Sequence, residues 1–139
     1  MIIIKSLTTR QDISQTTITG LLGTTYTDKV LDARTAVEGS PALRLTAETD
    51  RIYHKIAQNT TSVREEQPTD RPRFDIIRDK LDDTVVWNPW ATKAAAMSDF
   101  GPAEGWKNML CVEAGSVSGW QKLEPGETFE AGQVLKSYA

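Results

Sequence analysis

Short bursts of apolar residues, separated by turn-forming residues, run along most of the chain. Alternation of apolar and polar side chains indicates a strand with one buried face, and it is clearest around Leu43 and Leu45. Strands are expected at 16–19, 42–47, 51–56, 74–77, 84–87, 108–113, 128–130 and 133–138. Short strands at this spacing, with Gly, Pro, Asn and Asp between them, are typical of an antiparallel β-sandwich or barrel. We therefore expect an all-β fold.

Two segments depart from this pattern. Residues 90–97 follow Pro89 and precede Gly101-Pro102, which predicts one short helix. Residues 58–73 are polar, contain two prolines and show no apolar period. We expect a long, mobile loop or the tip of a hairpin there.

Composition narrows the class of protein further. The 139 residues, 39% hydrophobic and 25% charged, are ordinary for a single globular domain over 1–139. A net charge of −3 with scattered basic residues argues against a nucleic-acid partner. The one cysteine, Cys111, lies in an apolar run and is interpreted as a buried residue. No apolar run is long enough to cross a membrane, so we expect a cytoplasmic protein. We expect no cofactor and no metal site.

One carboxylate, Glu113, lies inside the apolar run at 109–115. A carboxylate in an otherwise buried strand is costly unless it is paired or used in chemistry. Glu113 is therefore the first candidate catalytic residue. The alternative is that it pairs with a nearby Lys or Arg.

Several motifs around these strands resemble a known family. They are Val-Val-Trp-Asn-Pro-Trp at 85–90, Lys93, Met97, Asp99-Phe100 and Met-Leu-Cys-Val-Glu at 109–113. Upstream, Asp12-Ile13, Gly20-Leu21, Tyr26, Asp28-Lys29 and Glu-Thr-Asp-Arg-Ile-Tyr at 48–53 follow in the same order, as does Leu-Glu-Pro-Gly-Glu at 123–127. Together they resemble the C-terminal half of the hexose-6-phosphate mutarotases, the glucose-6-phosphate 1-epimerases of the aldose 1-epimerase group.

The resemblance implies a β-sandwich of the galactose-mutarotase type, truncated to about its C-terminal half. It implies a hexose phosphate bound in a cleft on the concave sheet. The implied reaction exchanges the α and β anomers at C1 through ring opening and closing, which needs a base and an acid. The family's base falls on Glu113, and its ligand for sugar hydroxyls falls on Asp50. For Asp50 the alternative is a turn residue at a strand end.

The family's proton donor and phosphate-binding arginines have no counterpart in this chain. Family members are longer, and the N-terminal half that carries the arginines is missing. The family's acid histidine falls on Lys5, which could donate a proton only if burial strongly lowered its pKa. His54, the only histidine, shares a strand face with Asp50 and Ile52 and is a second candidate acid. The alternatives are a surface lysine and a hydrogen-bonded strand histidine.

Aromatic and basic side chains supply further candidates for substrate binding. We expect Trp87 and Trp90 in the core, and Trp106 and Trp120 near loops, where they could stack on a sugar. Arg51 is a candidate for binding an anion, with a solvated strand residue as the alternative.

These features leave three functions open. The first is a truncated mutarotase-like isomerase acting on a sugar or sugar phosphate, with Glu113 as base. The second is a repurposed isomerase or cyclase acting on a non-sugar metabolite, and the third is a non-catalytic carbohydrate-binding or structural remnant. Because half a sandwich exposes sheet edges and apolar surface, we expect a homodimer in which a second copy covers the exposed half.

Overall fold

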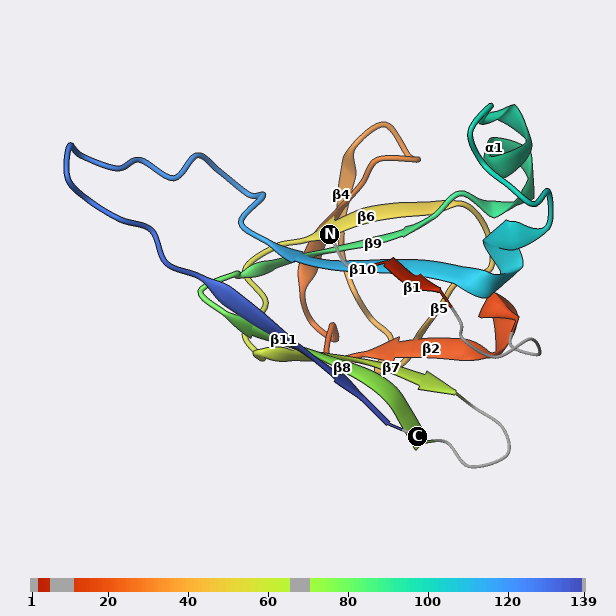
Figure 1. Ribbon diagram of the computed structural model, residues 1–139, viewed down its shortest axis with the longest axis horizontal. Coiled ribbons are helices and arrows are strands. Elements are labelled where there is room, and N and C mark those ends of the chain that lie inside the picture. The colour runs from red at the N-terminus through yellow and green to blue at the C-terminus, as the bar shows by residue number, and fades with distance from the viewer. Residues whose placement is uncertain (1–2, 6–11, 66–70, 139) are drawn as a thin grey trace.

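Two antiparallel sheets face each other in the computed structural model, which describes residues 3–5, 12–65 and 71–138 (Figure 1). Within these residues one sheet has six strands, in the order β1-β10-β9-β6-β3-β4, and the other has five, in the order β11-β8-β7-β2-β5. The strands of the first sheet, in that order, are Ile3–Lys5, Met109–Gly115, Asp83–Asn88, Thr49–Tyr53, Thr25–Asp28 and Arg34–Val37. Those of the second are Gly132–Ser137, Arg71–Asp79, Thr60–Glu65, Thr16–Thr19 and Leu43–Arg44. The helices are α1 (Trp90–Ala96) and the 3-10 turns η1 (Ile13–Gln15) and η2 (Gly105–Asn108).

The core lies between the two sheets and is built from alternate side chains of the strands. The buried residues of this core include Ile18, Val63, Ile76, Tyr53, Val86, Leu110 and Val112. Burial of each large apolar side chain contributes roughly 1.5–3 kcal/mol, so these positions dominate the stability of the sandwich. In β10, Leu110 and Val112 point into the core, which places Glu113 on the opposite, outer face of the six-stranded sheet.

The Asn-Pro-Trp turn after β9 fixes how α1 and η2 join the sandwich. Asn88 is fully buried, and its side-chain amide donates to the carbonyl oxygens of Trp106 (2.9 Å) and Met109 (2.7 Å). Its side-chain oxygen accepts from the backbone N–H of Trp90 (2.8 Å), which has a positive φ of 56°. One polar side chain thus ties the end of β9 to the start of β10 and to the start of α1.

Most of the expected elements are confirmed. The antiparallel all-β architecture is present, and α1 coincides with the helix expected at 90–97. Of the two alternatives for 58–73, the structure has a hairpin, in which β7 and the start of β8 pair and extend further than expected; its tip, residues 66–70, lies outside the described residues. The sequence shows no apolar period for β7 because one of its buried residues, Thr61, is polar; Thr61 is fully buried and accepts a hydrogen bond from Arg78.

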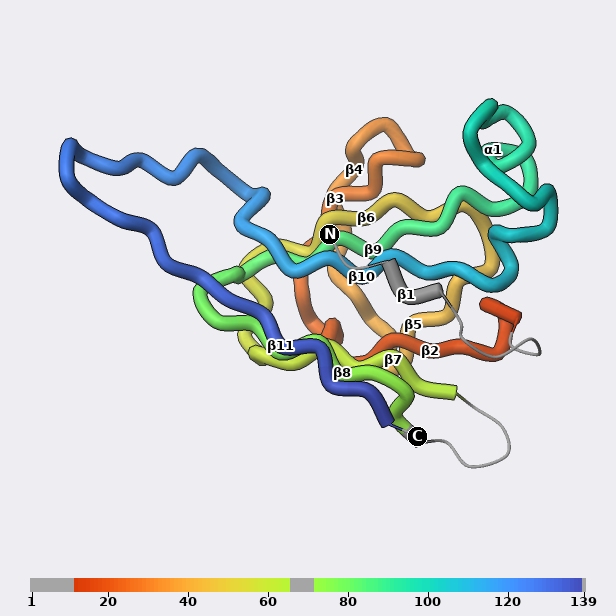
Figure 2. The backbone as a smooth tube through the Cα atoms, in the orientation of Figure 1, coloured from red at the N-terminus to blue at the C-terminus, as the bar shows by residue number. Residues whose placement is uncertain are grey.

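Several short strands differ from the expectation. The strand expected at 42–47 is reduced to β5, residues 128–130 form no strand, and β3 and β4 were not expected. Between β10 and β11, residues 116–131 leave the body of the sandwich and return (Figure 2). We call this segment the arm. Within the described residues no helix is long and apolar enough to cross a membrane.

Candidate functional site

The outer face of the six-stranded sheet brings together the main candidates. Strand register places Glu113 opposite Val85, Val85 opposite Ile52, and Ile52 opposite Thr27, so these side chains form one row across four strands. A second row runs from Cys111 through Trp87 to Asp50. Directly opposed residues in a sheet point to the same face. Glu113, Asp50 and Trp87 therefore share the outer face.

Glu113 is half-buried on this face, and its carboxylate makes no hydrogen bond or ion pair with any residue that the structure describes. Its charge acts on its neighbour in the same strand. Burial raises the pKa of the Cys111 thiol to about 12, and the nearby Glu113 carboxylate adds to the increase. The alternative of a Glu113 ion pair with Lys or Arg finds no support among the described residues. Glu113 is thus a carboxylate with free acceptor oxygens on an accessible face.

Asp50 lies on the same face but is already paired. Its Oδ2 atom is 2.9 Å from the Nζ atom of Lys29, whose side chain is 52% exposed while that of Asp50 is 24% exposed. Two strand spacings of about 4.8 Å and a two-residue offset of about 3.4 Å each place the Cα atoms of Glu113 and Asp50 roughly 12 Å apart. A ring-sized ligand can span this separation. Lys29 was not among the sequence candidates, because its position beside Asp50 follows only from the pairing of β3 with β6.

His54 lies at the end of β6 and is held by hydrogen bonds on both ring nitrogens. Nε2 is 2.7 Å from the hydroxyl of Thr27, and Nδ1 is 2.7 Å from the hydroxyl of Ser118. Because Ser118 donates its own proton to Asp83 (2.5 Å), its oxygen accepts from Nδ1–H of His54. In this tautomer Nε2 accepts the proton of Thr27. Neutral His54 is therefore a proton acceptor on the outer-face side, and only its protonated form is an acid.

Asp83 anchors this network from a buried position in β9. Its carboxylate also accepts from the backbone N–H groups of Lys55 (3.0 Å), Val117 (2.6 Å) and Ser118 (2.6 Å). Burial alone would raise the pKa of Asp83, but the hydrogen bonds from Ser118, Lys55 and Val117 outweigh it and lower this pKa. The base of the arm is thereby fastened to the strand that separates Glu113 from Asp50.

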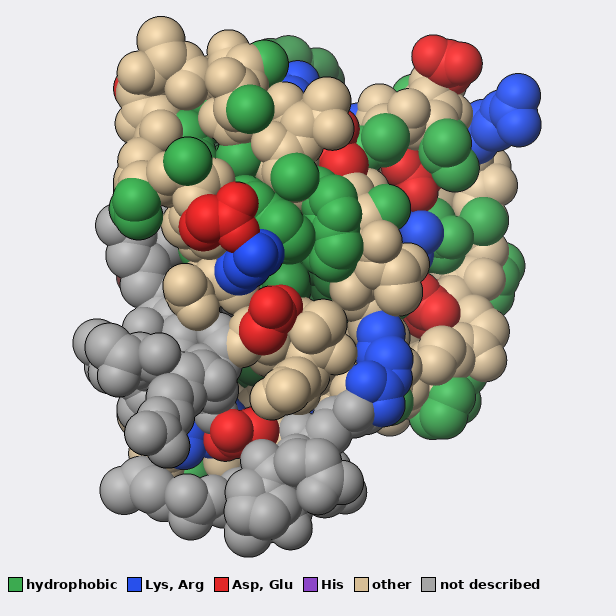
Figure 3. All heavy atoms as spheres, turned by 90° about the vertical axis from the view of Figure 1, so that its right-hand side faces the viewer, with side chains coloured by type: hydrophobic (Ala, Val, Ile, Leu, Met, Phe, Trp, Pro, Cys, Tyr) green, Lys and Arg blue, Asp and Glu red, His purple; other side chains and the backbone are tan. Residues whose placement is uncertain are grey.

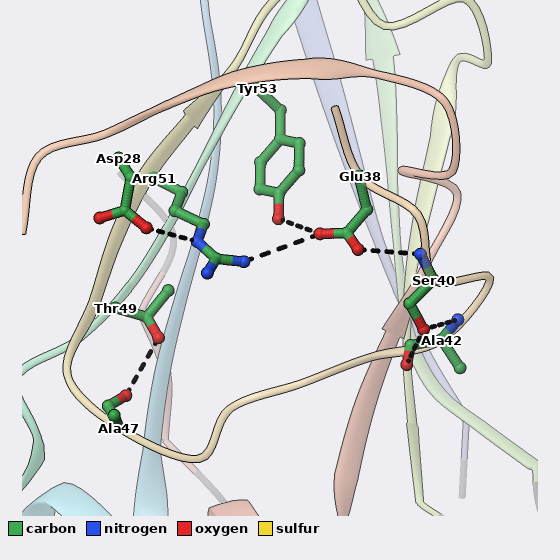
Figure 4. Close-up of polar contacts among 8 residues, drawn as sticks. All are labelled: Asp28, Glu38, Ser40, Ala42, Ala47, Thr49, Arg51 and Tyr53. Atoms are coloured by element: carbon green, nitrogen blue, oxygen red, sulfur yellow. Dashed lines mark hydrogen bonds and ion pairs between the residues drawn. The ribbon is translucent and has the colours of Figure 1, made fainter. Parts of the chain in front are cut away.

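Arg51, a candidate for binding an anion, does not lie on the same face as the other candidates. Its side chain points to the interior side of the sheet, opposite to that of Asp50. Nε donates to Asp28 (2.9 Å), and a terminal nitrogen lies 3.7 Å from Glu38 (Figure 4). Glu38 in turn accepts from the hydroxyl of Tyr53 (2.9 Å), and burial raises the pKa of that hydroxyl. Arg51 therefore neutralises two buried carboxylates.

The tryptophans are also distributed differently from the expectation. Trp106 is buried, and its ring packs against that of Trp90 at 4.6 Å between centroids, so the expectation that it is available to a ligand is wrong. The Asn88 amide also donates to the Trp106 carbonyl, which fixes the backbone of η2 at this point. Trp87 is half-buried on the outer face and not in the core. Trp120 is fully exposed on the arm.

Pockets lie elsewhere on the molecule. One, of about 40 Å³, lies beside η1 and η2 and is lined by Ile13, Val63, Phe74 and Leu110 together with charged side chains. Figure 3 shows this end of the molecule, where hydrophobic side chains gather at the centre and charged ones surround them. Another, of about 270 Å³, lies at the β8–β9 turn around Arg78. Neither is lined by Glu113, Asp50 or His54.

Lys5 is the remaining candidate for the acid. The backbone of Lys5 pairs with Met109 at the edge of the sheet, and its side chain lies outside what the structure describes. In the described part of the chain, no group of three or more His, Cys, Asp or Glu residues is placed to hold a metal ion.

Comparison with known proteins identifies the family. The family model described as aldose 1-epimerase matches residues 5–136. A Cenchrus ciliaris protein named "Putative glucose-6-phosphate 1-epimerase" is 37% identical over 126 residues, which are 91% of this chain and 37% of that protein.

Solved structures agree on the fold. The structure of a "putative mutarotase" from Salmonella typhimurium is 28% identical, with a TM-score of 0.63, over 73% of this chain and 32% of that one. Protein HI1317 shares the fold at 23% identity, with a TM-score of 0.65, over 90% of this chain and 42% of that one. The sandwich is therefore of the mutarotase type, as expected. The chain spans little more than a third of the curated relative that it matches. By the extent of the family match, this chain belongs to the aldose 1-epimerase family.

Proposed function

We propose that this chain exchanges the anomers of a sugar or sugar phosphate, with Glu113 as the base. The observation that carries the proposal is the half-buried Glu113 carboxylate, unpaired among the described residues, on the same outer face as Asp50 and Trp87. Family membership and the name of the Cenchrus ciliaris relative support a hexose phosphate as the substrate.

The chemistry assigns a separate role to each group. Glu113 takes the proton from the hydroxyl on C1, and the bond between C1 and the ring oxygen breaks as that oxygen gains a proton. The resulting open-chain aldehyde rotates about the C1–C2 bond and closes with the opposite configuration, returning both protons. Asp50 accepts hydrogen bonds from sugar hydroxyls once Lys29 shifts. Lys29 is then placed to bind a phosphate oxygen.

We propose His54 as the proton donor to the ring oxygen. His54 reaches the same face, and in its protonated form Nε2–H is a donor beside Thr27. Ser118 and Asp83 orient the ring, much as a carboxylate orients a catalytic histidine. His54→Gln, which can still hydrogen-bond but cannot act as an acid, is expected to slow the exchange if His54 protonates the ring oxygen.

A non-catalytic sugar-binding function is the second candidate. It is favoured by the free-state contacts: both nitrogens of His54 are already hydrogen-bonded, and Asp50 is already paired with Lys29. A binder raises its melting temperature with glucose 6-phosphate by mass action but does not accelerate anomer exchange.

The direct test is polarimetry of glucose 6-phosphate mutarotation with wild-type protein, Glu113→Gln and the control Glu130→Gln on the exposed arm. Loss of a positioned base lowers rates by roughly 10²–10⁴-fold, so Glu113→Gln is expected to approach the buffer rate. Glu130→Gln is expected to match wild type. If wild type does not exceed the buffer rate, the proposed activity is refuted.

We propose that the chain forms a homodimer with a second copy of itself. Such a homodimer covers apolar surface and sheet edges that the chain alone leaves open.

A further inference from the structure

Exposed apolar side chains concentrate in one short part of the chain, the arm together with β11. Six large hydrophobic side chains there are at least 39% exposed: Val117, Trp120, Leu123, Phe129, Val134 and Leu135. Trp120 is 101% exposed, so it has essentially no packing partner within the chain. Exposed side chains of this size favour a binding surface on the arm or on β11.

The exposure of Leu135 shows that the sandwich is open on this side. Leu135 lies opposite Ile76, which is fully buried, so both side chains point to the inner face of the five-stranded sheet. Leu135 is nevertheless 44% exposed. The core is therefore incomplete at β11.

β11 also presents a free hydrogen-bonding edge. It is the last strand of its sheet and pairs only with β8 among the described strands. The N–H of Tyr138 bonds to the carbonyl of Arg73 on β8, so residues at even positions of β11 direct their backbone groups to β8. Backbone groups therefore alternate along β11, and those of Gln133, Leu135 and Ser137 point away from β8, towards the open edge.

We propose that β11 pairs with β11 of a second copy of this chain, antiparallel about a two-fold axis that passes beside Leu135. This inference rests on the homodimer in the proposed function and names its surface. In this register Leu135 lies opposite Leu135 of the other copy, and Gln133 lies opposite Ser137. Each of these pairs exchanges both of its backbone hydrogen bonds, and every outward-pointing group of the strand is satisfied.

Side-chain chemistry is compatible with this self-pairing. A two-fold axis perpendicular to the sheet keeps inner-face residues opposite inner-face residues, so the exposed Leu135 side chains meet in the gap in the core. On the outer face Lys136 lies opposite Val134, which avoids the like-charge pair that centring the axis on Lys136 would create. The five-stranded sheets of the two copies then form one continuous sheet.

A second copy fits this surface better than an unrelated polypeptide because one strand supplies both partners with matching donors, acceptors and apolar side chains. A strand of another protein could pair with the same edge, but only self-pairing about the two-fold axis places Leu135 opposite Leu135 of the second copy. This difference makes the register testable.

The first experiment is spontaneous disulfide formation in Leu135→Cys, with Val134→Cys as the matched control. Opposed residues in a hydrogen-bonded antiparallel pair have Cα atoms about 5.5 Å apart, which a disulfide spans. Leu135→Cys is expected to give a covalent dimer under mild oxidation, and Val134→Cys to give much less. The native Cys111 is buried, with the pKa of its thiol raised to about 12, so it does not compete. Equal cross-linking of both variants, or none, overturns the register.

The second experiment is light scattering after size-exclusion chromatography over a wide range of concentration. Wild type is expected at about 31 kDa, twice the chain mass of 15.4 kDa. Gln133→Pro removes an outward N–H without touching the β8 pairing, and is expected to weaken the dimer roughly tenfold to a hundredfold, whereas Gln133→Ala is not. A wild-type monomer at high concentration refutes the inference.

Failure of the dimer and failure of the proposed activity give different results. A monomer that accelerates anomer exchange leaves the activity standing and removes only this interface. A β11-linked dimer without activity leaves this interface standing and refutes only the proposed activity.

Discussion

Replacement of Asp83 by Ala tests how strongly one buried carboxylate joins the arm to the site. Asp83 is 2% exposed, and its carboxylate accepts hydrogen bonds from three backbone N–H groups and from the Ser118 hydroxyl. Each backbone donor that loses a charged acceptor costs about 1 kcal/mol. We therefore expect Asp83→Ala to lower the free energy of unfolding by about 2–3 kcal/mol.

Urea unfolding followed by circular dichroism measures this loss, provided that the m-value, the slope of the unfolding free energy against urea concentration, is the same for both proteins. Asp82→Ala is the matched control, because Asp82 is adjacent and exposed, and its effect is expected to stay within about 0.5 kcal/mol. Equal effects of the two substitutions would refute the role given to Asp83.

The same carboxylate produces a dependence on pH with a defined sign. The pKa of Asp83 in the folded protein lies below its ordinary value of 3.8, so its contribution is fully present above that value. It is lost as pH falls towards and through the folded pKa, since the unfolded chain then binds the proton more readily. The difference in stability between wild type and Asp83→Ala is therefore expected to shrink as pH falls below about 4.

Three further outcomes follow from particular contacts. Arg51→Met is expected to destabilise the fold by about 2–3 kcal/mol in urea unfolding, because Asp28 and Glu38 lose their cation; a neutral effect would contradict the interior ion pair. Trp120→Ser is expected to leave the unfolding free energy of the monomer within about 0.5 kcal/mol of wild type, measured at low concentration, and a larger loss would mean that the arm packs on its own chain. Cys111 is expected to resist alkylation in the native protein and to react in urea, as read by mass spectrometry; rapid native labelling would contradict its burial.

Strands whose apolar residues alternate could be placed from the sequence alone, whereas strands without that signal could not. β2 and β9 carry β-branched residues that the core buries. All four residues of β4 are exposed, so no apolar period marks it. β7 was missed because the buried residue Thr61 is polar, and only its long-range hydrogen bond from Arg78 makes that burial favourable.

The candidate site, too, could be predicted from the sequence only in part. Period-two geometry brings Asp50, Ile52 and His54 to one face, and it also excludes Arg51, which is adjacent to Asp50 and must face the other way. The partners of His54 and Asp50 lie far along the chain, at Ser118 and Lys29, and pairing between strands brings them close. Trp106 was misplaced for the same reason, since its ring packs against Trp90 and its carbonyl accepts from the amide of Asn88.

Exchange between the two anomers of glucose 6-phosphate at equilibrium, observed by proton NMR at C1, tests the central claim most directly. The method needs no coupling enzyme and reports only bond breaking and closure at C1. Wild type is expected to speed the exchange, and Glu113→Gln to return it to the buffer rate while its melting temperature stays near that of wild type. Undiminished exchange in Glu113→Gln, with a folded protein, would show that Glu113 is not the base.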